Sequence, residues 1–141
     1  MLTLLLLELL MTAPLTVEGP GVPEGVETLE GLRWKQRVLL LFPGEPGGPW
    51  QAQLQGLERA RPELAERDVL VLIVGDTAGK DARVPDERQA RARWKVAPGE
   101  GAAVLIGKDG GEKWRSPLPA PWEEMFPVID AMPMRKQEQG G

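Results

Sequence analysis

The sequence of 141 residues contains no cysteine, histidine, tyrosine or asparagine, and its only serine is Ser116. Without cysteine the chain forms no disulfide and offers no thiolate to attack a peroxide or a disulfide. Without histidine it has neither a serine–histidine nor a cysteine–histidine pair, and zinc sites built from these residues are excluded. Without asparagine it has no acceptor for N-linked glycosylation. The missing residues therefore exclude thiol redox chemistry and the common histidine-assisted nucleophiles.

The charge balance is acidic, with 17 basic and 21 acidic residues and a net charge of −4. A dedicated nucleic-acid-binding domain is normally basic, so we expect no nucleic-acid partner. Residues 80–115 reverse this balance, with 9 basic and 6 acidic side chains. A basic region on an acidic chain leaves binding to an anionic surface or polymer as a further hypothesis.

Two tryptophans have basic neighbours in the sequence. Trp34 lies between Arg33 and Lys35, and the alternation predicts that the indole packs while both cations face water. Around Trp94 the basic residues are Arg88, Arg91, Arg93 and Lys95. For these four we predict a solvated helix face rather than a nucleic-acid interface.

The first residues differ in character from the rest of the chain. Residues 1–13 begin with the apolar run MLTLLLLELLM, which is shorter than the roughly 20 residues that a membrane span requires. The run is similar to the apolar core of a secretory signal, and an amphipathic first helix is the alternative. Residues 14–28 are rich in proline and glycine and predict a linker. This organisation favours export to the periplasm or the extracellular space over a cytoplasmic location, and predicts a domain over residues 29–138 and a tail over 139–141.

Three short apolar runs predict strands buried in a sheet: residues 38–42, 69–74 and 102–106. Runs of this length without polar alternation are typical of strands that are covered on both faces. The Asp-Gly-Gly turn after Lys108 predicts a hairpin, because these residues tolerate positive φ. Residues 112–115 then return as an antiparallel edge strand.

The segments between these runs have helical spacing. One apolar face is formed by Trp50, Leu54, Leu57, Ala60 and Leu64. Pro62 lacks an amide donor, so we expect it to kink or restart this helix. Two more helices are predicted over residues 85–94 and 121–132, the second ending at Pro133, and we expect the tail RKQEQGG (135–141) to fray. The order β-α-β-α-β-β-α predicts an α/β fold with a four-stranded mixed sheet flanked by helices.

Four strings of sequence carry a family resemblance. They are GLRWKQRVLLLF (31–42), LAERDVLVLIVGD (64–76), VLIGKDGGEKWR (104–115) and IDAMPMR (129–135). Together they resemble the peroxiredoxin-like domain of unknown function that occurs in bacterial proteins and in animal sushi-repeat-containing extracellular proteins. The resemblance covers about residues 29–138, and its first and last strings are the most specific. It implies a thioredoxin-like fold and no established activity.

The resemblance also indicates which chemical groups of the redox relatives are missing. Those relatives place a reactive cysteine between the first core strand and the first core helix, where this chain reads PGEPGGPW (43–50), without cysteine or the threonine that assists peroxide binding. They carry a cis-proline before the third core strand, where this chain has Glu100 and Gly101. Their peroxide-polarising arginine would fall in the same stretch, which contains none.

The groove that thioredoxin folds use for partners provides the candidate site. The residues expected to form it are Glu45, Trp50, Asp76 and Glu100. The alternative for the first two is that Trp50 covers the core and Glu45 is solvated. Asp76, Asp81 and Asp86 do not have the spacing of an EF-hand loop, so we predict no metal site, and nothing in the sequence indicates a cofactor.

A redox scaffold without its reactive group favours a non-catalytic module that binds a protein or a small molecule. The alternative is a hydrolase or transferase that uses carboxylates in the same groove. That alternative requires one of the acids to have a raised pKa in a closed pocket. We therefore assign no catalytic residue from the sequence.

Overall fold

The structure is a computed structural model that describes residues 29–75 and 83–140. Its elements are η2 (Glu30–Leu32), β1 (Arg37–Phe42), α2 (Gly48–Glu66), β2 (Val69–Ile73), α3 (Glu87–Trp94), β3 (Ala102–Ile106), β4 (Glu112–Pro117), α4 (Trp122–Asp130) and α5 (Pro133–Gly140). The predicted order β-α-β-α-β-β-α is confirmed, with an additional C-terminal helix. The predicted leader, the linker, Asp76 and Asp81 lie outside the described residues.

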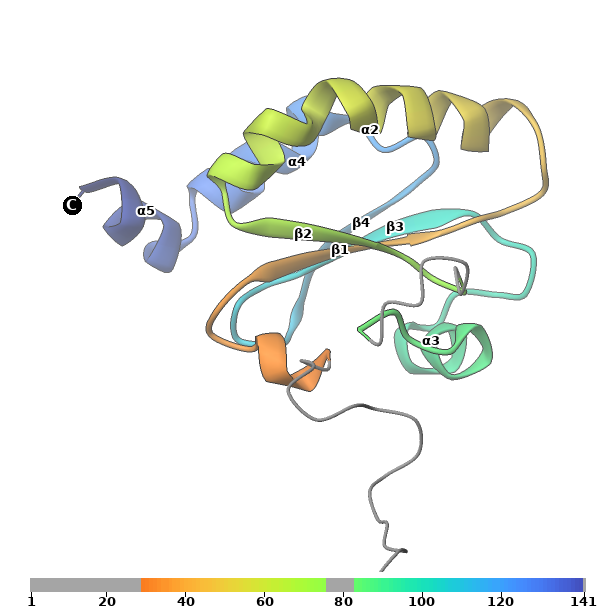
Figure 1. Cartoon of the computed structure of the whole chain (residues 1–141), viewed down its shortest axis with the longest axis horizontal. Coiled ribbons are helices and arrows are strands. Elements are labelled where there is room, and N and C mark those ends of the chain that lie inside the picture. Colours follow the sequence, from red (N-terminus) through yellow and green to blue (C-terminus); the bar gives the residue numbers. More distant parts are fainter. Residues whose placement is uncertain (1–28, 76–82, 141) are drawn as a thin grey trace, which may run out of the picture.

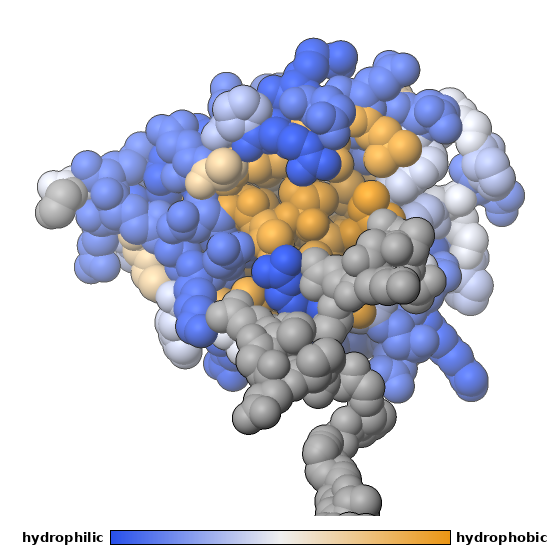
Figure 2. Space-filling model, in the orientation of Figure 1, coloured by the Kyte–Doolittle hydropathy of each residue, from blue (hydrophilic) through white to orange (hydrophobic). Residues whose placement is uncertain are grey.

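The four strands form one mixed sheet in the order β2-β1-β3-β4. β1 pairs with β2 in parallel, with Leu39 opposite Val71, and with β3 antiparallel, with Leu40 opposite Val104. β4 is the predicted antiparallel edge strand. β2 is the other edge, and its Leu70, Val71 and Ile73 are only half-buried, so the second apolar run is not a fully covered strand as expected. Figure 2 shows a hydrophobic area over this edge, below α2.

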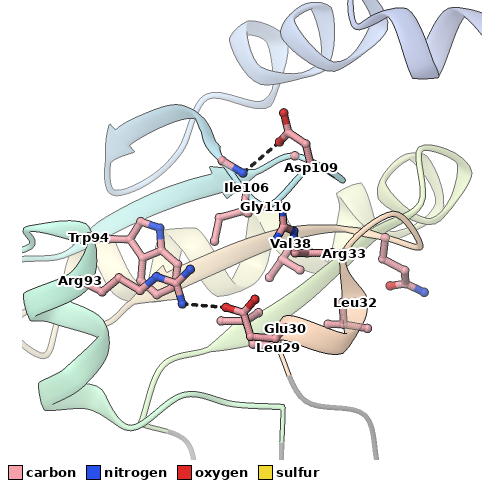
Figure 3. Close-up of a pocket in the computed structure, with 13 residues that line it drawn as sticks. Leu29, Glu30, Leu32, Arg33, Val38, Arg93, Trp94, Ile106, Asp109 and Gly110 are labelled. Atoms are coloured by element: carbon pink, nitrogen blue, oxygen red, sulfur yellow. Dashed lines mark hydrogen bonds and ion pairs between the residues drawn. The ribbon is translucent and has the colours of Figure 1, made fainter.

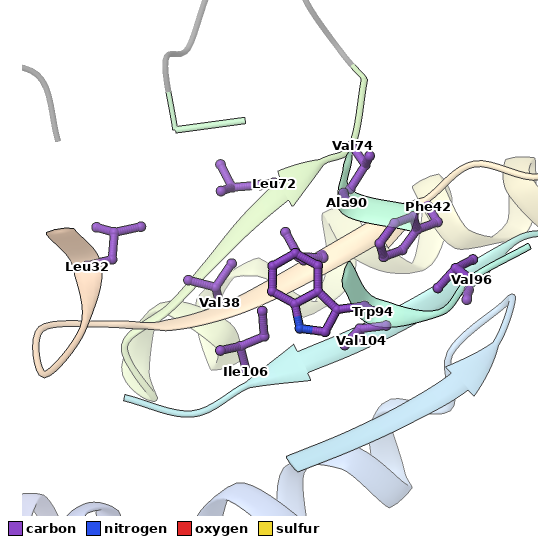
Figure 4. Packing of buried hydrophobic residues seen from close by; sticks show 12 residues of the cluster. Leu32, Val38, Phe42, Leu72, Val74, Ala90, Trp94, Val96, Val104 and Ile106 are labelled. Carbon is purple, nitrogen blue, oxygen red and sulfur yellow. The ribbon is translucent and has the colours of Figure 1, made fainter. Parts of the chain in front are cut away.

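Helices cover both faces of the sheet: α2 and α4 lie on one face, and α3 with η2 on the other (Figure 1). Because successive strand side chains point to opposite faces, β1 contributes to two hydrophobic clusters. Val38, Leu40 and Phe42 pack with Trp94 on the α3 face (Figure 4). Leu39 and Leu41 pack against α2 and α4. All six residues of β1 are buried, which places this strand at the centre of the domain.

Two local predictions, for the chain after Pro133 and for Trp34, were wrong, and one of the two alternatives for Pro62 is excluded. α2 continues through Pro62 to Glu66 and does not restart. The chain after Pro133 is the helix α5, and its Arg135 is buried, because ionic contacts fix this segment to the end of the sheet. Trp34 does not pack: its side chain is 61% exposed, and its backbone has φ +70°.

Candidate functional site

A groove of about 510 Å³ lies at the carboxyl ends of β1 and β2, beside the start of α2. This is where the resemblance places the reactive cysteine of redox relatives. Its lining includes the apolar side chains of Trp50, Leu54 and Ile73 and the charged side chains of Glu87 and Arg91 from α3. A second hollow of about 670 Å³ shares Glu87 and Arg91 and extends over the outer side of α3. The thioredoxin-type groove is therefore open and largely apolar on one side.

Arg91 determines the shape of this groove. Its Nη1 donates to the carbonyl oxygens of Ala97 and Glu100 at 2.7 and 2.8 Å, and its Nη2 donates to that of Pro43 at 2.7 Å. Its Nε donates to the Glu87 carboxylate at 3.0 Å. Arg91 is 7% exposed, so the prediction that it lies on a solvated face was wrong. The stretch before β3 contains no arginine of its own, as the sequence shows. Arg91 reaches this stretch from α3, and it donates to backbone carbonyls there.

Two glycines allow the loops on either side of Arg91 to approach each other. A Cβ atom built on Gly44 would lie 2.8 Å from the backbone nitrogen of Gly101 and 2.9 Å from its Cα. Contacts this short are not tolerated between a side chain and a backbone. The loop after β1 and the loop before β3 therefore close against each other only because both positions lack a side chain.

The four predicted site residues have different environments. Trp50 is half-buried; it lines the groove and also packs against the core on the α2 face. Glu45 is exposed beside Gly99. Glu100 is also exposed, and its Oε1 accepts a hydrogen bond from the Ala97 amide at 2.9 Å, which closes the turn before β3. Asp76 lies outside the described residues. The structure thus brings Trp50 together with Glu87 and Arg91, which the sequence did not place there.

The backbone before β3 follows the sequence prediction. Glu100 and Gly101 lead directly into β3, and the one cis peptide bond in the described part of the chain joins Leu118 to Pro119, after β4. Next to this bond, the Ala120 amide donates to Oε1 of the buried Gln53 at 2.7 Å. This hydrogen bond links the β4–α4 connection to α2.

A network of ion pairs lies at the opposite end of the sheet. Arg37, the first residue of β1, is fully buried and donates to both oxygens of Glu138 at 3.2 Å and to the Arg67 carbonyl at 2.7 Å. Lys108 Nζ lies 2.7 Å from Glu138 and 2.9 Å from Asp68. These contacts join α5 to β1 and to the β3–β4 turn.

A second group of ion pairs continues this network. Arg67 donates to both oxygens of Asp130 at 3.0 and 3.1 Å. Arg135 contacts the same carboxylate at 3.3 Å and donates to the Glu66 carbonyl at 3.1 Å. The network therefore ties the end of α2 to α4 and α5.

Two carboxylates of the network, Glu138 and Asp130, have lowered pKa values. Burial acts to raise the pKa of Glu138, but hydrogen bonds from Arg37 and Lys108 outweigh it and lower the pKa overall. Hydrogen bonds from Arg67, assisted by Arg135, lower the pKa of Asp130. Both groups are held in the charged form, which suits a structural role and opposes one as a general acid.

A third cavity, of about 250 Å³, lies on the α3 face between η2, α3 and the β3–β4 turn (Figure 3). Leu32, Val38 and Ile106 give it apolar walls. At its rim Arg93 Nη1 lies 3.3 Å from the Glu30 carboxylate. No local sequence pattern indicates this cavity, because its walls come from three separate segments.

Most of the basic residues between positions 80 and 115 have carboxylate partners. Those paired are Arg91, Arg93, Lys108, Lys113 and Arg115. Pairing leaves less positive charge for an anionic polymer than the count of basic residues suggests. In residues 29–75 and 83–140, no three potential metal ligands gather in one place, and no helix is long and apolar enough to cross a membrane.

Solved structures share the fold of this chain at low sequence identity. The reduced 2-Cys peroxiredoxin of Plasmodium vivax is 17% identical, with a TM-score of 0.60 over 77% of this chain and 72% of that chain. AhpC of Enterococcus faecalis is 16% identical, with a TM-score of 0.55 over 79% and 82% of the two chains. A Chlorobium tepidum protein described as the thiol:disulfide interchange protein DsbE is 18% identical, with a TM-score of 0.50 over 67% and 80%.

The predicted thioredoxin-like fold is thereby confirmed. A search of curated proteins found no significant match. A family model does match, over residues 28–138, and its family is described as a domain of unknown function, DUF4174. The peroxiredoxin-like resemblance stated from the four strings agrees with this match. The chain therefore belongs to the DUF4174 family, and its domain has the fold of peroxiredoxins and thioredoxin-like proteins.

Proposed function

We propose that this protein is a non-catalytic, thioredoxin-like module that binds a partner in the groove at the carboxyl end of β1. The absence of cysteine supports a role without thiol chemistry. Trp50, Leu54 and Ile73 provide apolar surface of the kind that ligand sites use for affinity. The partner is a protein segment or a small molecule with an apolar group that fits beside α2.

This proposal rests mainly on the hydrogen bonds of Arg91. Its hydrogen bonds go to Glu87 and to three backbone carbonyls, so they shape the groove before any ligand arrives. A preformed site loses less conformational entropy on binding than a site that must first be ordered. The geometry supports recognition in a fixed groove.

The alternative, an enzyme that uses groove carboxylates, has less support. Glu45 and Glu100 are both exposed, and neither lines the groove. Glu87 does line it, but its carboxylate is engaged by Arg91. A general acid or base works best in a closed site with a shifted pKa, and the described acids lack that enclosure.

The proposal is tested by ¹⁹F NMR of the full chain labelled with 5-fluorotryptophan, screened against a library of small aromatic and aliphatic fragments. The expected hits shift the Trp50 resonance more than those of the other four tryptophans, because Trp50 lines the groove. The matched variants are Leu54→Lys, which places a charge in the groove, and Gln55→Lys, which places it at the next, exposed position of α2.

We expect Leu54→Lys to abolish the shifts and Gln55→Lys to retain them. Fragments that bind equally well to both variants, or a library in which nothing moves the Trp50 resonance, would contradict the proposal.

A further inference from the structure

A small cavity of about 250 Å³ lies at the end of the sheet farthest from the groove. Three parts of the chain line it: Trp34 and Arg37 before and at the start of β1, residues 107–109 with Lys113 in the β3–β4 hairpin, and Met132–Met134 between α4 and α5. Its walls are mainly the indole, the two thioethers and Pro133, so the cavity is apolar with a few charged side chains at its edges.

The lining residues coincide with the strings that carry the family resemblance. Each of the nine belongs to residues 31–42, 104–115 or 129–135. The groove, by contrast, draws Trp50, Leu54, Arg91 and Gly99 from outside these strings. Three of the four strings that carry the resemblance therefore meet in space at this cavity.

Trp34 is held outward at the edge of the cavity. Its 61% exposure makes it the one large hydrophobic side chain that is exposed within the described ranges. Its φ of +70° is unfavourable for a residue with a side chain, and its amide donates to the Lys108 carbonyl at 2.6 Å. Strained backbone of this kind persists where the surrounding structure enforces it and is concentrated at functional sites. An exposed tryptophan is also the residue type most enriched among binding hot spots.

Among the described residues, Arg33 beside Trp34 is a cation without a carboxylate partner. Lys113 contacts Asp109 at 2.8 Å, and Arg37 and Lys108 both contact Glu138. The Arg33 guanidinium lies 5.9 Å from the centre of the Trp34 ring and forms no ion pair with the described residues. The local charge that a partner would meet beside the indole is therefore positive, although the whole chain has a net charge of −4.

We propose that Trp34 and this cavity form a docking site for an acidic segment of another protein, which inserts one apolar side chain between Trp34 and Met132–Met134. The cavity volume suits a single side chain, and methionine walls adapt to its shape. The exposed indole extends the apolar surface beyond the cavity, as a protein partner would require. A carboxylate next to the inserted side chain would pair with Arg33. This site is separate from the proposed groove and does not depend on it.

The test is a selection from a random dodecapeptide library displayed on phage, with the full chain immobilised, followed by affinity measurements on the synthesised peptides. We expect the enriched peptides to combine a large apolar residue with adjacent aspartate or glutamate. Trp34→Ala should weaken their binding at least about tenfold, and Trp34→Phe should restore part of it. Arg33→Gln should weaken binding several-fold and reduce its salt dependence, whereas Arg59→Gln, an exposed arginine on α2, should change neither.

Two sets of results would overturn this proposal. The first is an absence of enriched peptides, or enriched peptides that are basic or bind Trp34→Ala as tightly as the native chain. The second is self-association in sedimentation velocity that Trp34→Ala abolishes, because the occupant would then be a second copy. Peptides whose affinity falls only for the Leu54→Lys variant would support binding in the groove and count against the Trp34 site. The groove proposal and the Trp34 proposal can therefore fail independently.

Discussion

Replacing Glu138 by glutamine should destabilise the domain although the residue lies near the C-terminus. The native carboxylate accepts two hydrogen bonds from the fully buried Arg37 and one from Lys108. Glutamine keeps one acceptor oxygen but loses the negative charge. Arg37 still has the Arg67 carbonyl and Lys108 still has Asp68, and the remaining amide oxygen replaces only one of the two charged acceptors.

The magnitude follows from these contacts. A hydrogen bond to a charged group contributes about 1.5–3 kcal/mol, and a buried cation without its counterion is costly. Because each cation keeps one partner, we expect a loss of about 2 kcal/mol in the free energy of unfolding. For a domain of this size that corresponds to a fall in Tm of roughly 8 °C.

The assay is urea unfolding followed by tryptophan fluorescence and circular dichroism, with Glu58→Gln as the control. Glu58 contacts Arg61 at 3.0 Å across the surface of α2, where both side chains are more than half exposed. Such pairs contribute less than about 1 kcal/mol, so this variant should be close to native. A loss below about 0.5 kcal/mol for Glu138→Gln, or equal losses for the two variants, would refute the reasoning about the network.

Three other predictions concern the groove and the network. Gly44→Ala should cost at least about 1–3 kcal/mol, because its Cβ would lie 2.8 Å from the Gly101 nitrogen, whereas Gly48→Ala, which meets no atom within 4 Å, should be tolerated in thermal unfolding. Arg91→Ala should destabilise by at least about 3 kcal/mol by removing four hydrogen bonds, whereas exposed Arg88→Ala should be nearly silent; similar Tm values for the two variants would contradict this. The advantage of native Glu138 over Glu138→Gln should be full at neutral pH and be lost progressively as the pH falls below the unfolded-state pKa and through the lowered folded-state pKa of Glu138, because the carboxylate stabilises only while it is charged. A difference between the two proteins that stays constant from pH 7 to pH 3 would count against that linkage.

The strands could be predicted because their signal is local. Val38–Phe42 is continuously apolar, and such a run has few alternatives to a buried strand between two layers of helices. The hairpin could also be predicted from a local signal, the Asp-Gly-Gly turn. Whether an apolar run is central or at an edge depends on its neighbours, so the half-buried residues of β2 were not foreseen.

The functional features were harder to predict because they depend on contacts between distant segments. The predicted first strand begins at residue 38, after Arg37, and the burial of Arg37 depends on Glu138, 101 positions away, and on the Arg67 carbonyl. Arg91 shared the pattern of a solvated helix face, and only the fold brings the carbonyl of Pro43 within its reach. Trp34 was expected to pack because it alternates with two cations, but its amide donates to the Lys108 carbonyl, and no local pattern reveals that contact.

The most direct test of the central claim, binding in a preformed groove without thiol chemistry, is a crystallographic fragment screen of the full chain. If the groove is preformed, fragments should occupy it between Trp50, Leu54 and Arg91, with the carbonyl contacts of Arg91 unchanged from the unliganded crystal. An empty groove in crystals whose fragments bind at other sites would show that the groove is not a binding site. A groove in which Arg91 leaves those carbonyls to bind the ligand would contradict the claim that it is preformed.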